Sequence, residues 1–321
     1  MRYLHPCFRA NPWSLGGSAT LNNSRRYSIA PGLASAALGV FTFSLTLPMT
    51  RIGMQAYSAS TIGAGRGVIA GLFALLTLVV RREILPPRAD LLRLWVVGLG
   101  VVLGFPCFTS LALRDASASS VAILVALLPL LTAVFATLRA GEKPSWSFWL
   151  GAASGSAVVA SFVIASGASM RGAAVLWSAL AVLTCAVGYA EGGVLARRMM
   201  GWRVICWALV LCLPFSSAIL IFSGAPLWHQ KPWLSTWLAL AWVSMGSMFF
   251  GFFAWYRGLA MAGVARASQL QLLQPALTLL WCRLLLSEQL TPAMGVSALL
   301  VACCVAVCVR ARIVVREPTG S

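Results

Sequence analysis

The sequence predicts an all-α integral membrane protein with ten transmembrane helices, arranged as two inverted-topology repeats of five helices each. Three observations lead to this fold class. Of the 321 residues, 60% are hydrophobic and only 10% are charged, and the mean hydropathy is +0.87, which is far more apolar length than a soluble domain needs. Several apolar runs reach the roughly 20 residues that cross about 30 Å of hydrocarbon. A proline-broken apolar helix also occurs twice, at matching places in the two halves.

The apolar runs follow one another with short polar connections, and each of them is a candidate span. We expect spans at Ala30–Thr50, Tyr57–Val80, Leu94–Leu113, Ala116–Leu138, Trp146–Ser166, Gly172–Leu195, Val204–Phe222, Trp233–Tyr256, Ala267–Leu286 and Pro292–Val309. The first repeat would cover residues 30–169 and the second residues 170–310. Tails would precede and follow them at 1–29 and 311–321. The N-terminal tail has four arginines and no acidic residue, which also suits a transit peptide or a start codon assigned too far upstream.

Charge distribution predicts the orientation in the membrane. A formal net charge of +17 invites a nucleic-acid interpretation, but the basic residues form short clusters between apolar runs rather than one soluble face. With both termini in the cytoplasm, eighteen of the 24 lysines and arginines fall on the cytoplasmic side, as the positive-inside rule requires. Each repeat has an odd number of spans, so the second repeat enters the bilayer upside down. We therefore expect a multi-pass inner-membrane protein that binds no nucleic acid.

The two broken helices are the feature that points to a function. The ninth span carries Gln269, Gln271 and Gln274 and then Pro275, and sliding the sequence by 146 residues places Pro129 on Pro275. Proline deletes one backbone hydrogen bond of a helix, and in hydrocarbon the freed carbonyl must be satisfied by protein or by a polar cavity. Paired broken helices in corresponding halves indicate a transport site near the middle of the bilayer. Glutamines that join neighbouring helices are the alternative.

Four segments also carry a family resemblance. They read GLAMAGVARASQLQLLQPALTLLWCRLLLSEQLTP, TLPMTRIG, LGFPCFTSLALR and GYAEGGVLARR. These segments resemble the EamA-type carriers of the drug/metabolite transporter superfamily, and the likeness extends from Ala30 to about Val309. The resemblance implies a secondary transporter that exports a small polar metabolite, amino acid or drug by alternating access, with proton coupling. It does not indicate which solute moves.

Two departures from the family pattern lie near the end of the ninth span. Arg283 occupies a position where relatives usually carry a small residue, and Ser287 replaces the glycine that the first repeat retains before its glutamate. These residues would tune the outer gate, or Arg283 would simply pair with Glu288 about one and a half turns on. The ion pair is the interpretation that we favour.

The candidate substrate-lining residues follow from the broken helices. Gln271 and Gln274 are three residues apart and share a helix face with Pro275, whereas Gln269 lies on another face and is the weaker candidate. Pro129 is the counterpart in the first repeat, and Tyr189 would add an aromatic wall with a hydroxyl group. Arg66, expected about 6 Å inside the outer end of its helix, would attract an anionic or zwitterionic substrate or else cap loop carbonyls or a lipid phosphate.

Glu191 is the candidate for proton coupling. An acid inside a span costs at least about 2.5–3.5 kcal/mol, and a carboxylic acid in an apolar setting keeps its proton more readily than in water. Glu191 would then bind a proton in one state and release it in another. The alternative is an ion pair with Arg197 or Arg198 at the cytoplasmic rim. We expect Glu142 and Glu288 to anchor helix ends rather than to bind substrate.

Other function classes find little support in the sequence. The nine cysteines show no CxxC pair and no zinc spacing, so we expect no structural disulfide, no metal and no cofactor. The HExxH, Walker A and GxSxG motifs are absent, and we expect that the chain is not an enzyme. A membrane-embedded enzyme acting on a lipid-linked substrate and a passive pore are the alternatives. The expected partners are a small-molecule substrate, the lipid bilayer and protons, for a monomer or a homodimer.

Overall fold

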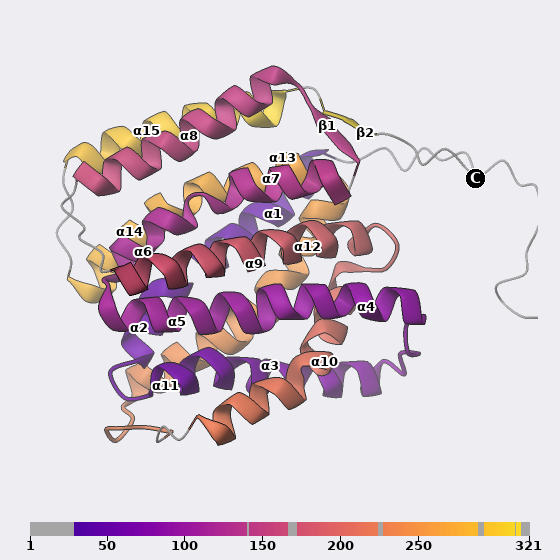
Figure 1. Cartoon of the computed structure of the whole chain (residues 1–321), viewed down its shortest axis with the longest axis vertical. Helices are drawn as coiled ribbons and strands as arrows, with labels where there is room; N and C mark the ends of the chain where they lie inside the picture. Colours follow the sequence, from indigo (N-terminus) through magenta and orange to yellow (C-terminus); the bar gives the residue numbers. More distant parts are fainter. Residues whose placement is uncertain are drawn as a thin grey trace, which may run out of the picture.

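The computed structural model describes residues 29–139, 141–165, 172–223, 227–287, 292–311 and 313–315, nearly all of them helical (Figure 1). The first half contains α1 (Ile29–Ser44), α2 (Thr46–Gly53), α3 (Ala59–Val80), α4 (Arg88–Val97), the π-helical η1 (Gly98–Gly104), α5 (Phe105–Asp115), α6 (Ala118–Val125), α7 (Leu128–Arg139) and α8 (Trp146–Ala165). The second half contains α9 (Gly172–Ala196), α10 (Gly201–Phe222), α11 (Leu234–Ala241), the π-helical η2 (Trp242–Gly251), α12 (Phe252–Ala262), α13 (Val264–Ser268), the 3₁₀-helical η3 (Gln269–Leu273), α14 (Gln274–Leu286) and α15 (Pro292–Arg310).

Two short strands join the halves at one end of the bundle. Strand β1 (Glu142–Pro144) pairs antiparallel with β2 (Ile313–Val315), so that Glu142 lies opposite Val315. We call this end, on the right of Figure 1, the strand end. Helices α7 and α9 end there, and α4, α10 and α13 begin there. The other end is called the opposite end, and α2 and α5 finish at it.

Among the described residues, six continuous helical runs are long and apolar enough to cross a membrane. They are Ile29–Gly53, Ala59–Val80, Arg88–Asp115, Gly172–Ala196, Gly201–Phe222 and Leu234–Ala262. The run that begins at Arg88 starts six residues before the expected span at Leu94. Helical hydrogen bonding does not stop where the hydrocarbon ends, because backbone groups pair within the helix in water as well as in lipid. The chain is therefore a helical membrane protein.

The expected breaks at the two prolines are confirmed. In each broken helix the proline is the second residue of the segment after the break, at Pro129 in α7 and Pro275 in α14. The backbone before Pro275 is a 3₁₀-helix, which accommodates the lost hydrogen bond by changing the pairing from four residues to three. Helix α7 ends at the strand end, whereas α14 ends at the opposite end (Figure 1).

The ends of the two broken helices also share an unusual backbone conformation. Gly141 follows α7 with φ of 63°, and Ser287 follows α14 with φ of 58°, at the same spacing of 146 residues as the two prolines. The left-handed region suits glycine but costs other residues about 1–2 kcal/mol. The second repeat thus keeps the left-handed helix cap that the first repeat makes with glycine. Glu288, residues 1–28 and most of the C-terminal tail lie outside the described residues.

The left-handed backbone conformation of Ser287 predicts that Ser287→Gly stabilises the protein. We expect a gain of about 1 kcal/mol in the free energy of unfolding, because glycine occupies the left-handed region without steric strain. Gly141→Ser is the matched variant and should lose a similar amount. Both can be compared by denaturant unfolding in detergent micelles. Equal stability of Ser287→Gly and the wild type would mean that contacts of the serine already offset its strain.

Glycines bring several helices into close contact, as their four-residue spacing predicts. Gly63 faces the backbone of α5, where a Cβ would lie 3.3 Å from the Cα of Cys107, and Gly71 faces Leu213 of α10. A Cβ at Gly188 of α9 would lie 3.3 Å from the Cα of Gly100 in η1. These positions hold the bundle together where no side chain would fit.

Gly192→Ala should strongly destabilise the protein. A Cβ at Gly192 would overlap the ring of Tyr256, which is fully buried and whose hydroxyl donates to the Gly188 carbonyl at 3.3 Å. We expect a loss of about 1–3 kcal/mol, the usual cost of overpacking a core. Gly172→Ala, at the open start of the same helix, is the control. In a Tyr256→Ala background the cost of Gly192→Ala should fall; an unchanged cost would exclude the ring as its cause.

Candidate functional site

The two broken helices meet in the core of the bundle. Gln269 Nε2 donates to the carbonyl oxygen of Pro129 at 3.2 Å, and both residues are buried. Gln269, the weaker candidate for lining the substrate site in the sequence analysis, is therefore the residue that links the two breaks. Its helix face was assigned from α-helical spacing, but the segment is a 3₁₀-helix with three residues per turn, which turns side chains to different neighbours.

The predicted substrate-lining amides lie beside this link. Gln271 and Gln274 are at most 5% exposed. Neither the Oε1 nor the Nε2 atom of Gln271 has a hydrogen-bond partner. The hydroxyl of Tyr189 faces the Gln271 amide, but their geometry falls short of a full hydrogen bond. Buried polar groups normally have partners, so the unpaired amide makes Gln271 a candidate for binding a polar ligand.

Arg66 approaches the same region from α3. It lies seven residues beyond the start of this helix at Ala59, about 10 Å along its axis, which is deeper than the expected 6 Å. Its neighbours in charge interactions are Cys107 of α5 and Cys185 and Tyr189 of α9. The side chain is 2% exposed, and its Nε and Nη1 atoms have no partner. Arg51, in contrast, caps a helix end, because it donates to the carbonyl of Leu113 in the last turn of α5 at 2.7 Å.

Tyr189 packs against three other aromatic side chains, called the aromatic wall below, which the sequence did not bring together. Its ring lies 5.2 Å from that of Trp255, 5.9 Å from that of Phe252 and 6.4 Å from that of Phe43, measured between centroids. These residues come from α1, α9 and α12. In a sequence, aromatic residues at a helix interface cannot be distinguished from ordinary core residues. Only the packing of the three helices brings them together.

Glu191 is buried and bound by two arginines at the strand end. Its Oε2 accepts from Arg139 Nε at 2.8 Å, and its Oε1 lies 3.5 Å from Arg93 Nε. The alternative prediction that Glu191 pairs with Arg197 or Arg198 is therefore wrong. They are close in sequence, but Glu191 faces α4 and α7, and Arg197 turns to another acid. The Oε1 atom makes no hydrogen bond, which leaves one acceptor position free.

Glu142 anchors a helix end, as expected, but this end is the start of α13 and not the end of α7, which Glu142 follows. Its two carboxylate oxygens accept from the backbone N–H groups of Val264 and Ala265 at 2.8 and 2.7 Å, and it forms an ion pair with Arg197. The N-terminus of a helix attracts negative charge through its free N–H groups and its dipole. Glu142 therefore ties the ends of α7 and α9 to the start of α13, which leads into the broken segment.

Comparison with known proteins decides the family. The model of the EamA-like transporter family matches residues 30–165 and, in a second copy, residues 172–310. The chain belongs to the EamA-like transporter family. Over 275 residues it is 39% identical to the uncharacterized transporter YdeK of Bacillus subtilis, covering 86% of this chain and 96% of YdeK. Over 150 residues it is 29% identical to the uncharacterized inner membrane transporter YedA of Escherichia coli K12, covering 46% of this chain and 47% of YedA.

A solved structure, described only as the crystal structure of a protein, has the same fold. Its TM-score is 0.68 at 22% sequence identity, and the match covers 88% of this chain and 98% of the solved chain. An EamA-like transporter is a membrane protein that moves a solute across the bilayer. The buried amides, Arg66 and the aromatic wall are the candidate solute-binding groups of this one.

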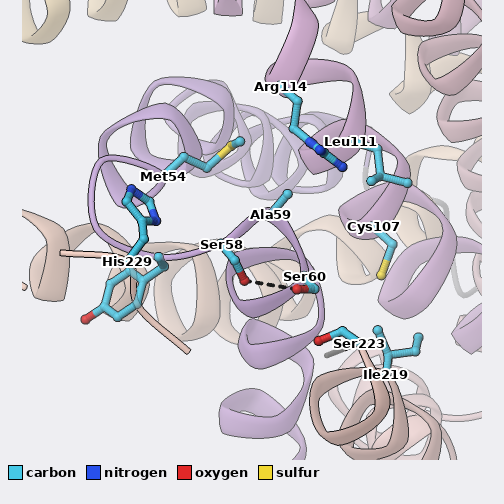
Figure 2. Close-up of a pocket in the computed structure, with 11 residues that line it drawn as sticks. Met54, Ser58, Ala59, Ser60, Cys107, Leu111, Arg114, Ile219, Ser223 and His229 are labelled. Atoms are coloured by element: carbon cyan, nitrogen blue, oxygen red, sulfur yellow. Dashed lines mark hydrogen bonds between the residues drawn. The ribbon is translucent and has the colours of Figure 1, made fainter. Parts of the chain in front are cut away.

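The two ends of the EamA-like bundle differ. At the strand end, ion pairs join neighbouring helices: Glu191 with Arg139, Glu142 with Arg197, and Glu83 with Arg203. At the opposite end a pocket of about 500 Å³ lies between α2, α3, α5 and α10. Figure 2 shows Ser58 and Ser60 at the start of α3, whose hydroxyl groups are hydrogen-bonded at 2.9 Å, with Cys107 and Arg114 on the neighbouring helix. Gln271, Tyr189 and Arg66 are not among the residues that line this pocket.

Proposed function

We propose that the chain is a secondary transporter that exports a small polar solute by alternating access, coupled to protons. The observation that carries the proposal is the set of unpaired, buried polar atoms on Gln271, in the second broken helix, and on Arg66, both of which neighbour Tyr189. Buried polar groups that lack partners within the protein suit a solute held between two gates. Gln274, Pro275, Pro129 and Tyr189 complete its lining.

Helices α7 and α14 run in opposite directions along the bundle. This supports an inverted arrangement of two five-helix repeats, of which the first covers residues 30–169 and the second residues 170–310. Ten spans follow, with both termini in the cytoplasm and the strand end facing the cytoplasm. The ion pairs of Glu191 and Glu142 at the strand end then form the closed inner gate, and the pocket at the opposite end is the vestibule of the outer gate. A monomer or a homodimer suits this arrangement.

Glu191 is the proposed proton-coupling residue. Its two arginine partners come from different helices, α4 and α7, so opening of the inner gate separates at least one of them from the carboxylate. A buried carboxylate that loses a cation is costly as an anion, and binding a proton removes that cost. The Oε1 atom of Glu191, which makes no hydrogen bond, is the oxygen that would bind this proton.

The proposal is tested with the purified full-length chain in liposomes loaded with the twenty proteinogenic amino acids, four nucleosides and glucose. Mass spectrometry follows the efflux of each compound, with and without a pH gradient. A carrier moves one or a few compounds faster than protein-free liposomes do and is accelerated by the same compound outside. Efflux of every small compound without this acceleration indicates a pore, and chemical conversion indicates an enzyme; either result overturns the proposal. Gln271→Leu, which keeps the size but removes the amide, should stop the flux.

A further inference from the structure

Arg66 is a buried cation without a counter-charge in the described part of the chain. It forms no ion pair and no hydrogen bond there, although its side chain is almost fully buried. A charged side chain in this situation costs several kcal/mol unless a partner offsets the loss of water. Arginine also keeps its charge where lysine would lose its proton. The fold therefore maintains a positive charge that no described residue of the protein neutralises.

The described acids are all committed elsewhere or lie far from Arg66 along the bundle. Glu83, Glu142 and Glu191 are paired with arginines at the strand end. Asp90 lies in the first turn of α4 at the same end, and Asp115 is the last residue of α5 at the opposite end. The groups that do surround Arg66 are the thiols of Cys107 and Cys185 and the hydroxyl of Tyr189, which are neutral. A missing anion is the simplest complement to this arrangement.

We propose that Arg66 binds the carboxylate group of the transported solute, so that the carrier selects small monocarboxylates, with Gln271 and Tyr189 binding the polar remainder. This inference rests on the proposed transport function. A guanidinium is planar and donates hydrogen bonds in a geometry that matches a carboxylate. A single cation among the described central residues balances one negative charge, which favours a monocarboxylate over a phosphate dianion.

Cys107 indicates how such a solute reaches Arg66. It lines the pocket at the opposite end and also interacts with the charge of Arg66. The pocket and the buried guanidinium thus lie on two sides of the same residue of α5. Gly63 packs against Cys107 at this point, so a small movement of α3 relative to α5 would open a path from the pocket to the site.

Matched pairs of solutes test the charge preference in proteoliposomes. Each of the twenty amino acids is compared with its amide, and short monocarboxylates are compared with their amides, since the members of a pair differ little in size and chiefly in the carboxylate. We expect the wild type to move at least one carboxylate more than tenfold faster than its amide, which corresponds to about 1.4 kcal/mol. Arg66→Gln should abolish this preference, and Arg66→Lys should retain part of it.

Arg88→Gln is the control, because this exposed arginine begins α4 at the strand end and lies outside both the pocket and the buried site. It should leave the preference intact. Equal fluxes of acid and amide in the wild type, or an unchanged preference in Arg66→Gln, would overturn the inference. If neutral or cationic solutes are exported and Arg66→Gln leaves their rates unchanged, the assignment of Arg66 fails while the transport function stands.

A labelling experiment separates the binding site from transport and from folding defects. N-ethylmaleimide modification of Cys107, which neighbours Arg66 and lines the pocket, is followed by peptide mass spectrometry in detergent. A carboxylate that binds at Arg66 should slow the modification in the wild type, and its amide should not. Protection that persists in Arg66→Gln, or equal protection by the amide or by chloride alone, contradicts the proposal. Protection without any flux would retain the Arg66 site and remove the transport function.

Discussion

Glu191→Gln is expected to abolish the efflux that a pH gradient drives, while counterflow exchange of the same solute continues near the wild-type rate. The glutamine amide has almost the size of the carboxylate but neither carries a charge nor exchanges a proton. Exchange requires only that the loaded carrier move between its two states, whereas net pH-driven flux requires the proton to be bound and released. Both fluxes are measured in proteoliposomes with the compound that the efflux screen identifies.

Glu83→Gln is the matched control for this experiment. It makes the same chemical change at the same end of the bundle, where Glu83 pairs with Arg203 of α10. The side chains of this pair are 15% and 34% exposed, so water already screens it and little should change. If Glu191 only anchors helices, Glu191→Gln should reduce both fluxes together and lower the unfolding temperature. That result, or an undiminished pH-driven flux, would reject the proton role.

The broken helices could be predicted from the sequence because their cause is local. Proline cannot donate the backbone hydrogen bond that a helix needs, so Pro129 and Pro275 interrupt their helices whatever surrounds them. The spacing of 146 residues between them recurs between the left-handed residues Gly141 and Ser287. Apolar length likewise indicated the six described helical runs that are long enough to cross a membrane, since the thickness of the hydrocarbon sets it. These features required no knowledge of the tertiary structure.

The partners of the buried charges could not be predicted in the same way. Helix periodicity shows which residues share a face with Glu191, but not which neighbouring helix that face meets. Arg197 follows Glu191 closely in sequence, yet it pairs with Glu142, which is 55 residues away, and Glu191 pairs with Arg139, which is 52 residues away. The partner of Gln269 could not be predicted for a related reason, because its backbone is not the α-helix that the spacing argument assumed.

Glu142→Gln is expected to have the largest effect on the closed state. The carboxylate is 1% exposed and accepts from the backbone N–H groups of Val264 and Ala265 while it pairs with Arg197. The amide has one acceptor oxygen instead of two, and its NH₂ group would face donors. Arg197, whose side chain is 19% exposed, would lose its counter-charge. Removal of one partner of a buried ion pair costs about 3–5 kcal/mol.

The damage should reach the central site, because α13 continues directly into the segment that carries Gln269 and Gln271. We therefore expect Glu142→Gln to lower the unfolding temperature in detergent and to reduce both pH-driven flux and exchange at least tenfold, unlike Glu191→Gln, which should spare exchange. A tenfold reduction corresponds to about 1.4 kcal/mol, well within the cost of the broken pair.

Two further variants distinguish this explanation from a general loss of folding. Lys143→Gln changes the exposed neighbour in β1 and should match the wild type in stability and flux. The double variant Glu142→Gln, Arg197→Gln removes both charges, so that no uncompensated cation remains, and it should recover part of the stability that Glu142→Gln loses. Equal stability of Glu142→Gln and Lys143→Gln, or no recovery in the double variant, would mean that the Glu142 carboxylate does not hold the start of α13 in place.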